Sequence, residues 1–306
     1  MGKRAFVFPG QGSQEVGMGR DLFESEGAVR ALYEEAGVLL GFDLAQISFS
    51  GPEEELRLTR ITQPALYVHG FALQQLLRAR GVAPQMTAGH SLGEFTAHAA
   101  AGSLDFAAGL RLVQVRAEAM NRAAALQPGM MAAILGLDFQ QLAAICESAA
   151  AAGVVAIANF NSPGQMVISG SRAGVEKAMA LALAAGARRT IPLAVSGAFH
   201  SPLMAPARDE LALALAAAPF NQPSVPVYSN VTAEACRDAA EIRRLLEEQL
   251  TRSVLWAAEV ERMIADGAEE FVEIGPGRVL AGLIKKIAPD AVVHSVGSLK
   301  DMDRFI

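Results

Sequence analysis

The segment PQMTAGHSLGEF (residues 84–95) holds a short apolar stretch, a glycine-bounded turn and the start of a helix. Ser91 lies at the centre of a G-x-S-x-G pattern that runs from Gly89 to Gly93. A serine on so sharp a strand-to-helix turn is exposed at the end of a sheet, and the amides of the following helix point toward its hydroxyl. The segment therefore predicts an α/β sheet that carries a nucleophilic serine. The alternative is an ordinary turn in which Ser91 only caps the helix.

Strands and helices alternate on both sides of this turn. We expect further strands at 4–9, 225–232, 269–275 and 291–297, and helices at 21–37, 61–81, 104–122, 201–218, 238–250, 255–266 and 277–288. Such alternation is typical of a mostly parallel sheet that is covered by helices on both faces. Residues 1–125 and 197–306 are therefore predicted to form one α/β, hydrolase-like catalytic domain.

Residues 126–196 show a different order of elements. The pattern there is β-α-β-β-α-β, with the two central strands, VVAIANFNS and QMVISGS, joined by a turn at Pro163–Gly164. This order is that of a ferredoxin-like unit. We expect residues 126–196 to be a ferredoxin-like subdomain inserted into the larger domain.

Composition excludes several classes of protein. The chain has 306 residues, of which 52% are hydrophobic and 19% charged, and its net charge is −6. An acidic balance argues against a general nucleic-acid-binding protein. The longest apolar run, around 149–158, is far shorter than the roughly 20 residues that a membrane span needs. With only two cysteines, we expect a cytoplasmic protein that acts away from membranes.

A nucleophilic serine needs a base, and His200 is the best of the five histidines. It lies in SGAFHSPLM, between a predicted strand and a predicted helix, where α/β sheets carry functional side chains. His90 adjoins Ser91, but neighbouring residues of a strand point to opposite faces. We therefore expect His200, and not His90, to reach the Ser91 hydroxyl.

Four motifs together resemble one family. FVFPGQGSQ (6–14), GHSLGEF (89–95), SGAFHSPLM (196–204) and VEIGPG (272–277) stand in the order and at the approximate spacing of the malonyl-CoA:acyl carrier protein transacylase family, which includes polyketide synthase acyltransferase domains. The resemblance implies a ping-pong enzyme that moves malonyl from malonyl-CoA to the phosphopantetheine thiol of acyl carrier protein in fatty-acid synthesis. It implies no metal and no redox cofactor. Nothing in the sequence demands more than a monomer, and we expect one.

The resemblance also implies roles for individual residues. Ser91 matches the family's nucleophile and His200 its catalytic histidine, and the backbone carbonyl of Gln249 would help to orient that histidine. The oxyanion hole would consist of the backbone amides of Gln11 and Leu92. The glycine-rich loop 6–14 lacks the third glycine of a dinucleotide-binding fingerprint. Its backbone amides would therefore stabilise the oxyanion that forms during the reaction, and would not bind a phosphate.

Other residues are implied to bind substrate. Arg116 matches the arginine that holds the malonyl carboxylate, and it borders the apolar face of its predicted helix, from which it could reach an enclosed site. Phe199 would crowd an α-methyl branch and so favour malonyl over methylmalonyl. Asn159, Asn161 and Gln165 would border the acyl-CoA cleft.

Three alternatives remain open at this point. A serine hydrolase or thioesterase could use the same serine and histidine, although no matching acidic residue is evident to orient the histidine. A binding or scaffold protein would not need Ser91. A freestanding acyltransferase could serve a polyketide synthase instead of fatty-acid synthesis. For docking the acidic carrier protein, Arg188–Arg189 and Lys285–Lys286 are candidate basic pairs.

Overall fold

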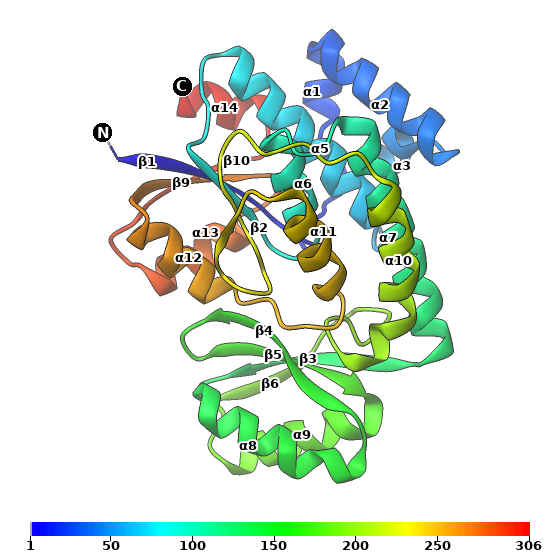
Figure 1. Ribbon diagram of the computed structural model, residues 1–306, viewed down its shortest axis with the longest axis vertical. Coiled ribbons are helices and arrows are strands. Elements are labelled where there is room, and N and C mark those ends of the chain that lie inside the picture. The colour runs from blue at the N-terminus through cyan, green and yellow to red at the C-terminus, as the bar shows by residue number, and fades with distance from the viewer. Residues whose placement is uncertain (1) are drawn as a thin grey trace.

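A computed structural model describes residues 2–306 and contains two sheets, the larger in the upper part of Figure 1 and the smaller below it. The larger sheet has the strand order β10-β9-β1-β2-β7-β8. All neighbouring strands in it are parallel except β8, which runs antiparallel to β7. The six strands are β1 (Lys3–Phe8), β2 (Met86–Gly89), β7 (Val227–Tyr228), β8 (Ala235–Cys236), β9 (Ala268–Ile274) and β10 (Val292–Val296).

Helices cover both faces of this sheet because its central strands are apolar on both sides. Phe6 and Phe8 of β1 face one cluster, and Ala5 and Val7 face the other, as the alternation of side chains along a strand requires. The helices of this part are α1 (Arg20–Ser25), α2 (Gly27–Leu40), α3 (Leu44–Ser50), α4 (Glu53–Leu56), α5 (Thr59–Ala79), α6 (Leu92–Ala100), α7 (Phe106–Leu126), α10 (Ala205–Ala217), α11 (Ala239–Glu248), α12 (Trp256–Ala265), α13 (Val279–Ile287) and α14 (Leu299–Phe305). The mostly parallel, helix-covered sheet that the sequence predicts is thus confirmed.

The smaller sheet is antiparallel and has the order β4-β5-β3-β6. Its elements follow one another as β3 (Gly129–Leu135), α8 (Phe139–Ala149), β4 (Val155–Ser162), β5 (Gln165–Ser171), α9 (Arg172–Ala184) and β6 (Arg189–Pro192). Both helices pack on one face, where Ala132 and Ile134 of β3 point, while Met131 points to the core of the larger part. This is the ferredoxin-like arrangement predicted for the middle of the chain, and we propose 126–196 as its boundaries.

The two sheets are joined through the edge strand β4. The segment after α11 pairs with β4: Val254 donates to Ala158 O at 2.8 Å and accepts from the Phe160 amide at 2.9 Å. The open face of the smaller sheet is thereby held against the carboxyl ends of β1 and β2.

Several expected elements differ in extent. The helix expected at 21–37 is two helices, because Glu26 is extended (φ −121°, ψ 108°) and Gly27 follows it. The strand expected at 225–232 pairs only at Val227–Tyr228, because the chain turns after Ser229 and returns as the antiparallel strand β8. The sequence did not indicate α3, α4, α14 or β8. No helix within residues 2–306 has both the length and the apolar character that a bilayer span requires.

Candidate active site

The turn after β2 holds Ser91 in a backbone conformation that side chains rarely adopt, with φ 54° and ψ −106°. Both flanking glycines are needed for steric reasons. A Cβ on Gly93 would lie 2.0 Å from the carbonyl oxygen of Phe8, and a Cβ on Gly89 would lie 2.0 Å from the backbone of Gly93. The G-x-S-x-G spacing therefore reflects how closely α6 approaches β1 and β2, and that approach exposes the Ser91 hydroxyl.

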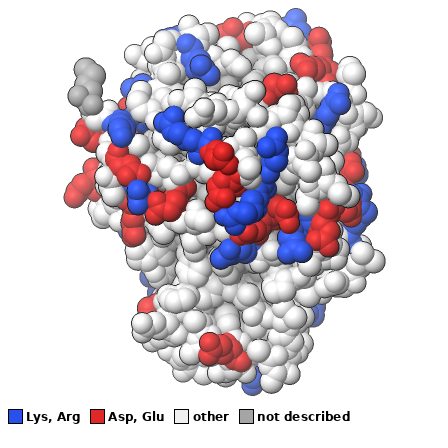
Figure 2. All heavy atoms as spheres, viewed as in Figure 1, with Lys and Arg blue, Asp and Glu red and all other residues white. Residues whose placement is uncertain are grey.

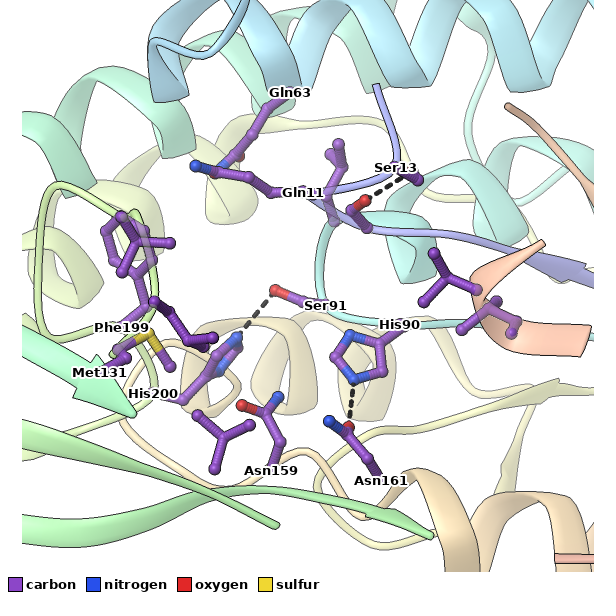
Figure 3. Close-up of a pocket in the computed structure, with 18 of the residues that line it drawn as sticks. Gln11, Ser13, Gln63, His90, Ser91, Met131, Asn159, Asn161, Phe199 and His200 are labelled. Carbon is purple, nitrogen blue, oxygen red and sulfur yellow. Dashed lines mark hydrogen bonds between the residues drawn. The ribbon is translucent and has the colours of Figure 1, made fainter. Parts of the chain in front are cut away.

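His200 contacts the Ser91 hydroxyl directly. Its Nε2 lies 2.8 Å from Ser91 Oγ (Figure 3). Its Nδ1 lies 2.8 Å from the backbone oxygen of Gln249. A carbonyl oxygen only accepts, so Nδ1 carries the proton and the Nε2 lone pair faces the hydroxyl. Burial, followed by the positive charge of Arg116, lowers the pKa of His200 to about 3. The imidazole is therefore a neutral base at physiological pH.

Arg116 is a fully buried cation beside the same hydroxyl. Its Nη2 donates to Ser91 Oγ and to Gln249 Oε1, each at 2.9 Å, and its Nη1 donates to Gln63 Oε1 at 2.7 Å. The guanidinium also lies over the ring of Phe95, 5.5 Å from its centroid. Burial lowers its pKa to about 9, so the group keeps its charge near pH 7. This buried charge is bound only to neutral groups, which suits it to hold an anionic substrate.

A layer of polar side chains beneath the turn fixes the serine. The Ser91 amide donates to Asn230 Oδ1 at 2.7 Å, and Asn230 Nδ2 donates to the carbonyl of Gly89 at 2.7 Å. Gln249 Nε2 donates to the Ser91 carbonyl at 2.9 Å. Gln249 thus contacts the base, the arginine and the nucleophile turn.

Sequence reasoning missed Asn230 and Gln63. Asn230 follows a short strand that neighbours β2, and a polar side chain at the carboxyl end of such a strand is a weak signal of a site. Gln63 lies among apolar residues in α5, in the stretch ITQPAL, and is 1% exposed. A buried glutamine in an otherwise apolar helix face is the signal that could have found it.

A cavity of about 230 Å³ opens above the Ser91–His200 pair, between the nucleophile turn and the smaller sheet. In Figure 3, Gln11 and Gln63 lie on one side of it, and Asn159 and Asn161 on the other. The lining contains nearly all of the predicted site residues: Gln11, Ser91, Leu92, Arg116, Asn159, Asn161, Gln165, Phe199 and His200. Gln249 lies behind the cavity, where it holds His200 and Arg116.

The two residues whose amides are predicted to form an oxyanion hole, Leu92 and Gln11, both line the cavity. Leu92 is the first residue of α6, so its N–H has no acceptor within the helix. The loop after β1 comes close because Gly10 has no side chain: a Cβ there would lie 2.5 Å from the carbonyl of His90. The loop places Gln11 at the cavity wall opposite Asn159.

The remaining candidates lie at the wall and mouth of the cavity. Asn161 Oδ1 lies 2.9 Å from His90 Nε2, which turns the His90 ring away from the serine hydroxyl. Asn159 is 5% exposed and Phe199 is 6% exposed. Gln165 Oε1 accepts from Lys286 Nζ at 2.8 Å, so an exposed lysine of α13 stands beside the mouth.

The whole chain matches a known family. The model of the acyl transferase domain matches residues 5–303. The chain belongs to the acyl transferase domain family. The chain is accordingly an acyltransferase, as the sequence predicted.

Relatives of this acyl transferase domain carry consistent names. The malonyl CoA-acyl carrier protein transacylase of Escherichia coli (strain K12) is 48% identical over 284 residues, which cover 92% of each chain. A crystal structure of an acyl carrier protein S-malonyltransferase from Vibrio cholerae O1 biovar eltor has a TM-score of 0.96 at 43% identity, covering 99% of this chain and 100% of that one. A type II polyketide synthase acyl-carrier protein in complex with its malonyl-transacylase gives 0.95 at 41% identity, with 98% of each chain covered.

Proposed function

We propose that this acyltransferase moves the malonyl group of malonyl-CoA to the phosphopantetheine thiol of acyl carrier protein, through a malonyl ester on Ser91, and so supplies fatty-acid synthesis. The observation that carries the proposal is the buried Arg116 guanidinium, 2.9 Å from Ser91 Oγ and in contact only with neutral groups. An acyl chain esterified to Ser91 that ends in a carboxylate would find its counter-charge there.

The first half-reaction forms the acyl-enzyme. Ser91 Oγ attacks the thioester carbonyl while its proton passes to His200 Nε2, 2.8 Å away. The developing oxyanion is held by the backbone amides of Leu92 and Gln11. The tetrahedral intermediate then breaks its C–S bond, and the proton on His200 goes to the departing thiolate of coenzyme A.

The second half-reaction runs the same steps in reverse with a new thiol. The phosphopantetheine thiol gives its proton to His200 and attacks the ester carbonyl, and Ser91 Oγ leaves and regains that proton. The Gln249 carbonyl keeps the Nδ1 proton in place, so the imidazole presents the same lone pair in both halves. These steps require no metal and no redox cofactor.

Selectivity follows from the same cavity. Arg116 discriminates for a carboxylate, because a buried guanidinium left without one is costly when an acetyl group occupies the site. Phe199, at the wall, would crowd an α-methyl branch. Asn159, Asn161 and Gln165 present amides along the side formed by the smaller sheet, where the pantetheine arm would lie.

Two alternatives remain weaker. A serine hydrolase usually orients its histidine with a carboxylate, whereas His200 Nδ1 is held here by the carbonyl of Gln249. Transfer of malonyl to the carrier protein of a polyketide synthase would use identical chemistry. It is the second candidate function, because the chain is similar to a malonyl-transacylase in complex with a type II polyketide synthase carrier protein.

The carrier protein must dock at the mouth of the cavity. Figure 2 shows positive and negative side chains interspersed on one face. On α11, Arg244 pairs with Glu241 and Glu248. Lys286, which contacts Gln165 at the mouth, is the basic residue best placed to meet an acidic partner. The proposal includes a monomeric enzyme in the cytoplasm.

Intact mass after mixing with malonyl-CoA tests this function. The unmodified protein should gain one malonyl group with release of one coenzyme A, and the adduct should transfer to carrier protein when it is added. Ser91→Ala should gain nothing. Continued release of coenzyme A without any thiol acceptor would instead identify a hydrolase, and an adduct on Ser91→Ala would reject the assigned nucleophile.

A further inference from the structure

The charge of Arg116 has no carboxylate against it. Its two Nη atoms donate to Gln63, Ser91 and Gln249, and none of its hydrogen bonds within residues 2–306 goes to an Asp or Glu. A fully buried cation is costly unless a negative charge lies near it. The free enzyme therefore needs a counter-charge that does not block the place of the substrate.

One buried carboxyl reaches Arg116 through a single amide. Gln249 accepts from Arg116 with Oε1 and donates from Nε2 to Glu94 Oε2 at 2.7 Å. Glu94 is 1% exposed, in the first turn of α6 directly after Ser91. Arg116, Gln249 and Glu94 thus form one continuous chain of hydrogen bonds that runs behind the cavity.

We propose that Glu94 is the counter-charge of Arg116, and that it takes up a proton from solvent when the malonyl carboxylate binds to Arg116. The inference rests on the proposed function, since it takes Arg116 as the group that holds the malonyl carboxylate. Glu94 is a positioning residue in this scheme, because it acts on the substrate only through Gln249 and Arg116.

The surroundings of Glu94 contain groups that favour its protonated form and groups that favour its ionised form. Burial raises its pKa to about 7, although hydrogen bonds from Gln249, Asn230 and Ser229 and the charge of Arg116 act in the opposite direction. The Asn230 amide donates to Glu94 Oε2 at 3.3 Å. Cys236, on β8, faces the same region with its pKa raised, mainly by burial.

The second acidic group nearby, Glu259 of α12, does not compete for this role. Its Oε1 accepts from Asn230 Nδ2 at 2.9 Å, and its Oε2 has no partner among the described residues. Burial, followed by the charge of Glu94, raises the pKa of Glu259 well above its ordinary value. In the described part of the chain, neither of its oxygens is linked to Arg116 through Gln249. Glu94 is therefore the carboxyl group of this layer that is connected to Arg116 through one amide.

Binding a malonyl carboxylate brings a second negative charge to Arg116. The malonyl carboxylate neutralises the guanidinium, which then stabilises the ionised form of Glu94 less. The pKa of Glu94 therefore rises, and Glu94 binds a proton more tightly in the complex than in the free enzyme. By linkage, malonyl-CoA binds best below about pH 7, where Glu94 is already neutral, and more weakly as pH rises above this value. Acetyl-CoA has no carboxylate and should show no such coupling.

The test compares KM for malonyl-CoA and acetyl-CoA from about pH 6 to about pH 8.5. In the unmodified enzyme, KM for malonyl-CoA should rise by up to about tenfold per pH unit above the pKa of Glu94, and KM for acetyl-CoA should stay flat. Glu94→Gln keeps the acceptor for Gln249 Nε2 but removes the charge. Its KM for malonyl-CoA should be independent of pH and no higher than the low-pH value of the unmodified enzyme. Glu259→Gln, the matched control, should keep the original pH dependence.

A direct measurement on the unmodified protein avoids any doubt about the folding of a variant. In weak buffer with an indicator dye near pH 7, mixing with malonyl-CoA should consume a fraction of a proton per active site. The same experiment with acetyl-CoA also releases coenzyme A, so its dye signal is subtracted from the malonyl-CoA signal. A malonyl adduct on Ser91 without proton uptake, or a pH dependence that survives in Glu94→Gln, would overturn the role of Glu94. Absence of the adduct would instead reject the proposed function.

Discussion

Arg116→Ala should change which acyl group the enzyme prefers. In the unmodified protein the malonyl carboxylate would be held, out of water, by a guanidinium that already makes contacts of 2.7 to 2.9 Å with its neighbours. Removing one partner of such a buried charged pair costs about 2–5 kcal/mol. For kcat/KM with malonyl-CoA this is a loss of about 30-fold to several thousandfold.

The effect on acetyl transfer should be much smaller. An acetyl group makes no ion pair, so with this substrate the variant loses the hydrogen bond that the charged guanidinium donates to Ser91 Oγ, which contributes about 1.5–3 kcal/mol. The malonyl complex loses that hydrogen bond as well, so the ratio of malonyl to acetyl kcat/KM should fall by the cost of the missing ion pair alone, about 30-fold or more. Arg116→Lys keeps the positive charge but lacks the planar guanidinium that binds a carboxylate through two N–H groups. Its malonyl-to-acetyl ratio should lie between those of the unmodified protein and Arg116→Ala.

The assay is release of coenzyme A from each thioester, with thermal melting to show that the variant is folded. Arg111→Ala is the matched control, because Arg111 is an exposed arginine of the same helix, α7. It should leave both rates unchanged. If Arg116→Ala folds and keeps the original malonyl-to-acetyl ratio, Arg116 does not hold the malonyl carboxylate and the reasoning fails.

Two further predictions concern the base and the turn. With acetyl-CoA, kcat/KM should not fall as the pH is lowered through 6.5, because the pKa of His200 is lowered to about 3 and the imidazole stays neutral. The measurement is a pH–rate profile, and a fall in rate near pH 6.5 would contradict the burial argument. Gly93→Ala would place a methyl group 2.0 Å from the Phe8 oxygen, so its free energy of unfolding should fall by about 1–3 kcal/mol or more in urea melts. Gly27→Ala, where nothing lies within 4 Å, is the control, and an equal loss there would refute the steric explanation.

The sequence was most informative where the chemistry depends on local spacing. The nucleophile turn is defined by the glycines on each side of Ser91, so strand, turn and helix could be predicted together. The alternation of strands and helices gave both sheets. Arg116 was placed correctly on the apolar border of its helix, and the structure buries it completely.

What the sequence could not show depends on contacts between distant segments. Asn230 matters because it bridges the turn at Ser91 and the end of β2, and its place after a short strand is only a weak signal of this role. The same holds for Glu94, whose position after the serine reads as an ordinary helix residue until Gln249 is brought against it. The break at Glu26 was missed because the apolar spacing continues across it.

The pairing of Val254 with the edge of β4 also ties the position of the base to the smaller sheet. The short segment that carries this pairing begins at Gln249, whose carbonyl orients His200. A swing of the smaller sheet away from the larger one would pull on this segment and shift that carbonyl. The alignment of the base therefore depends on the same contact between the two sheets that encloses the cavity above Ser91.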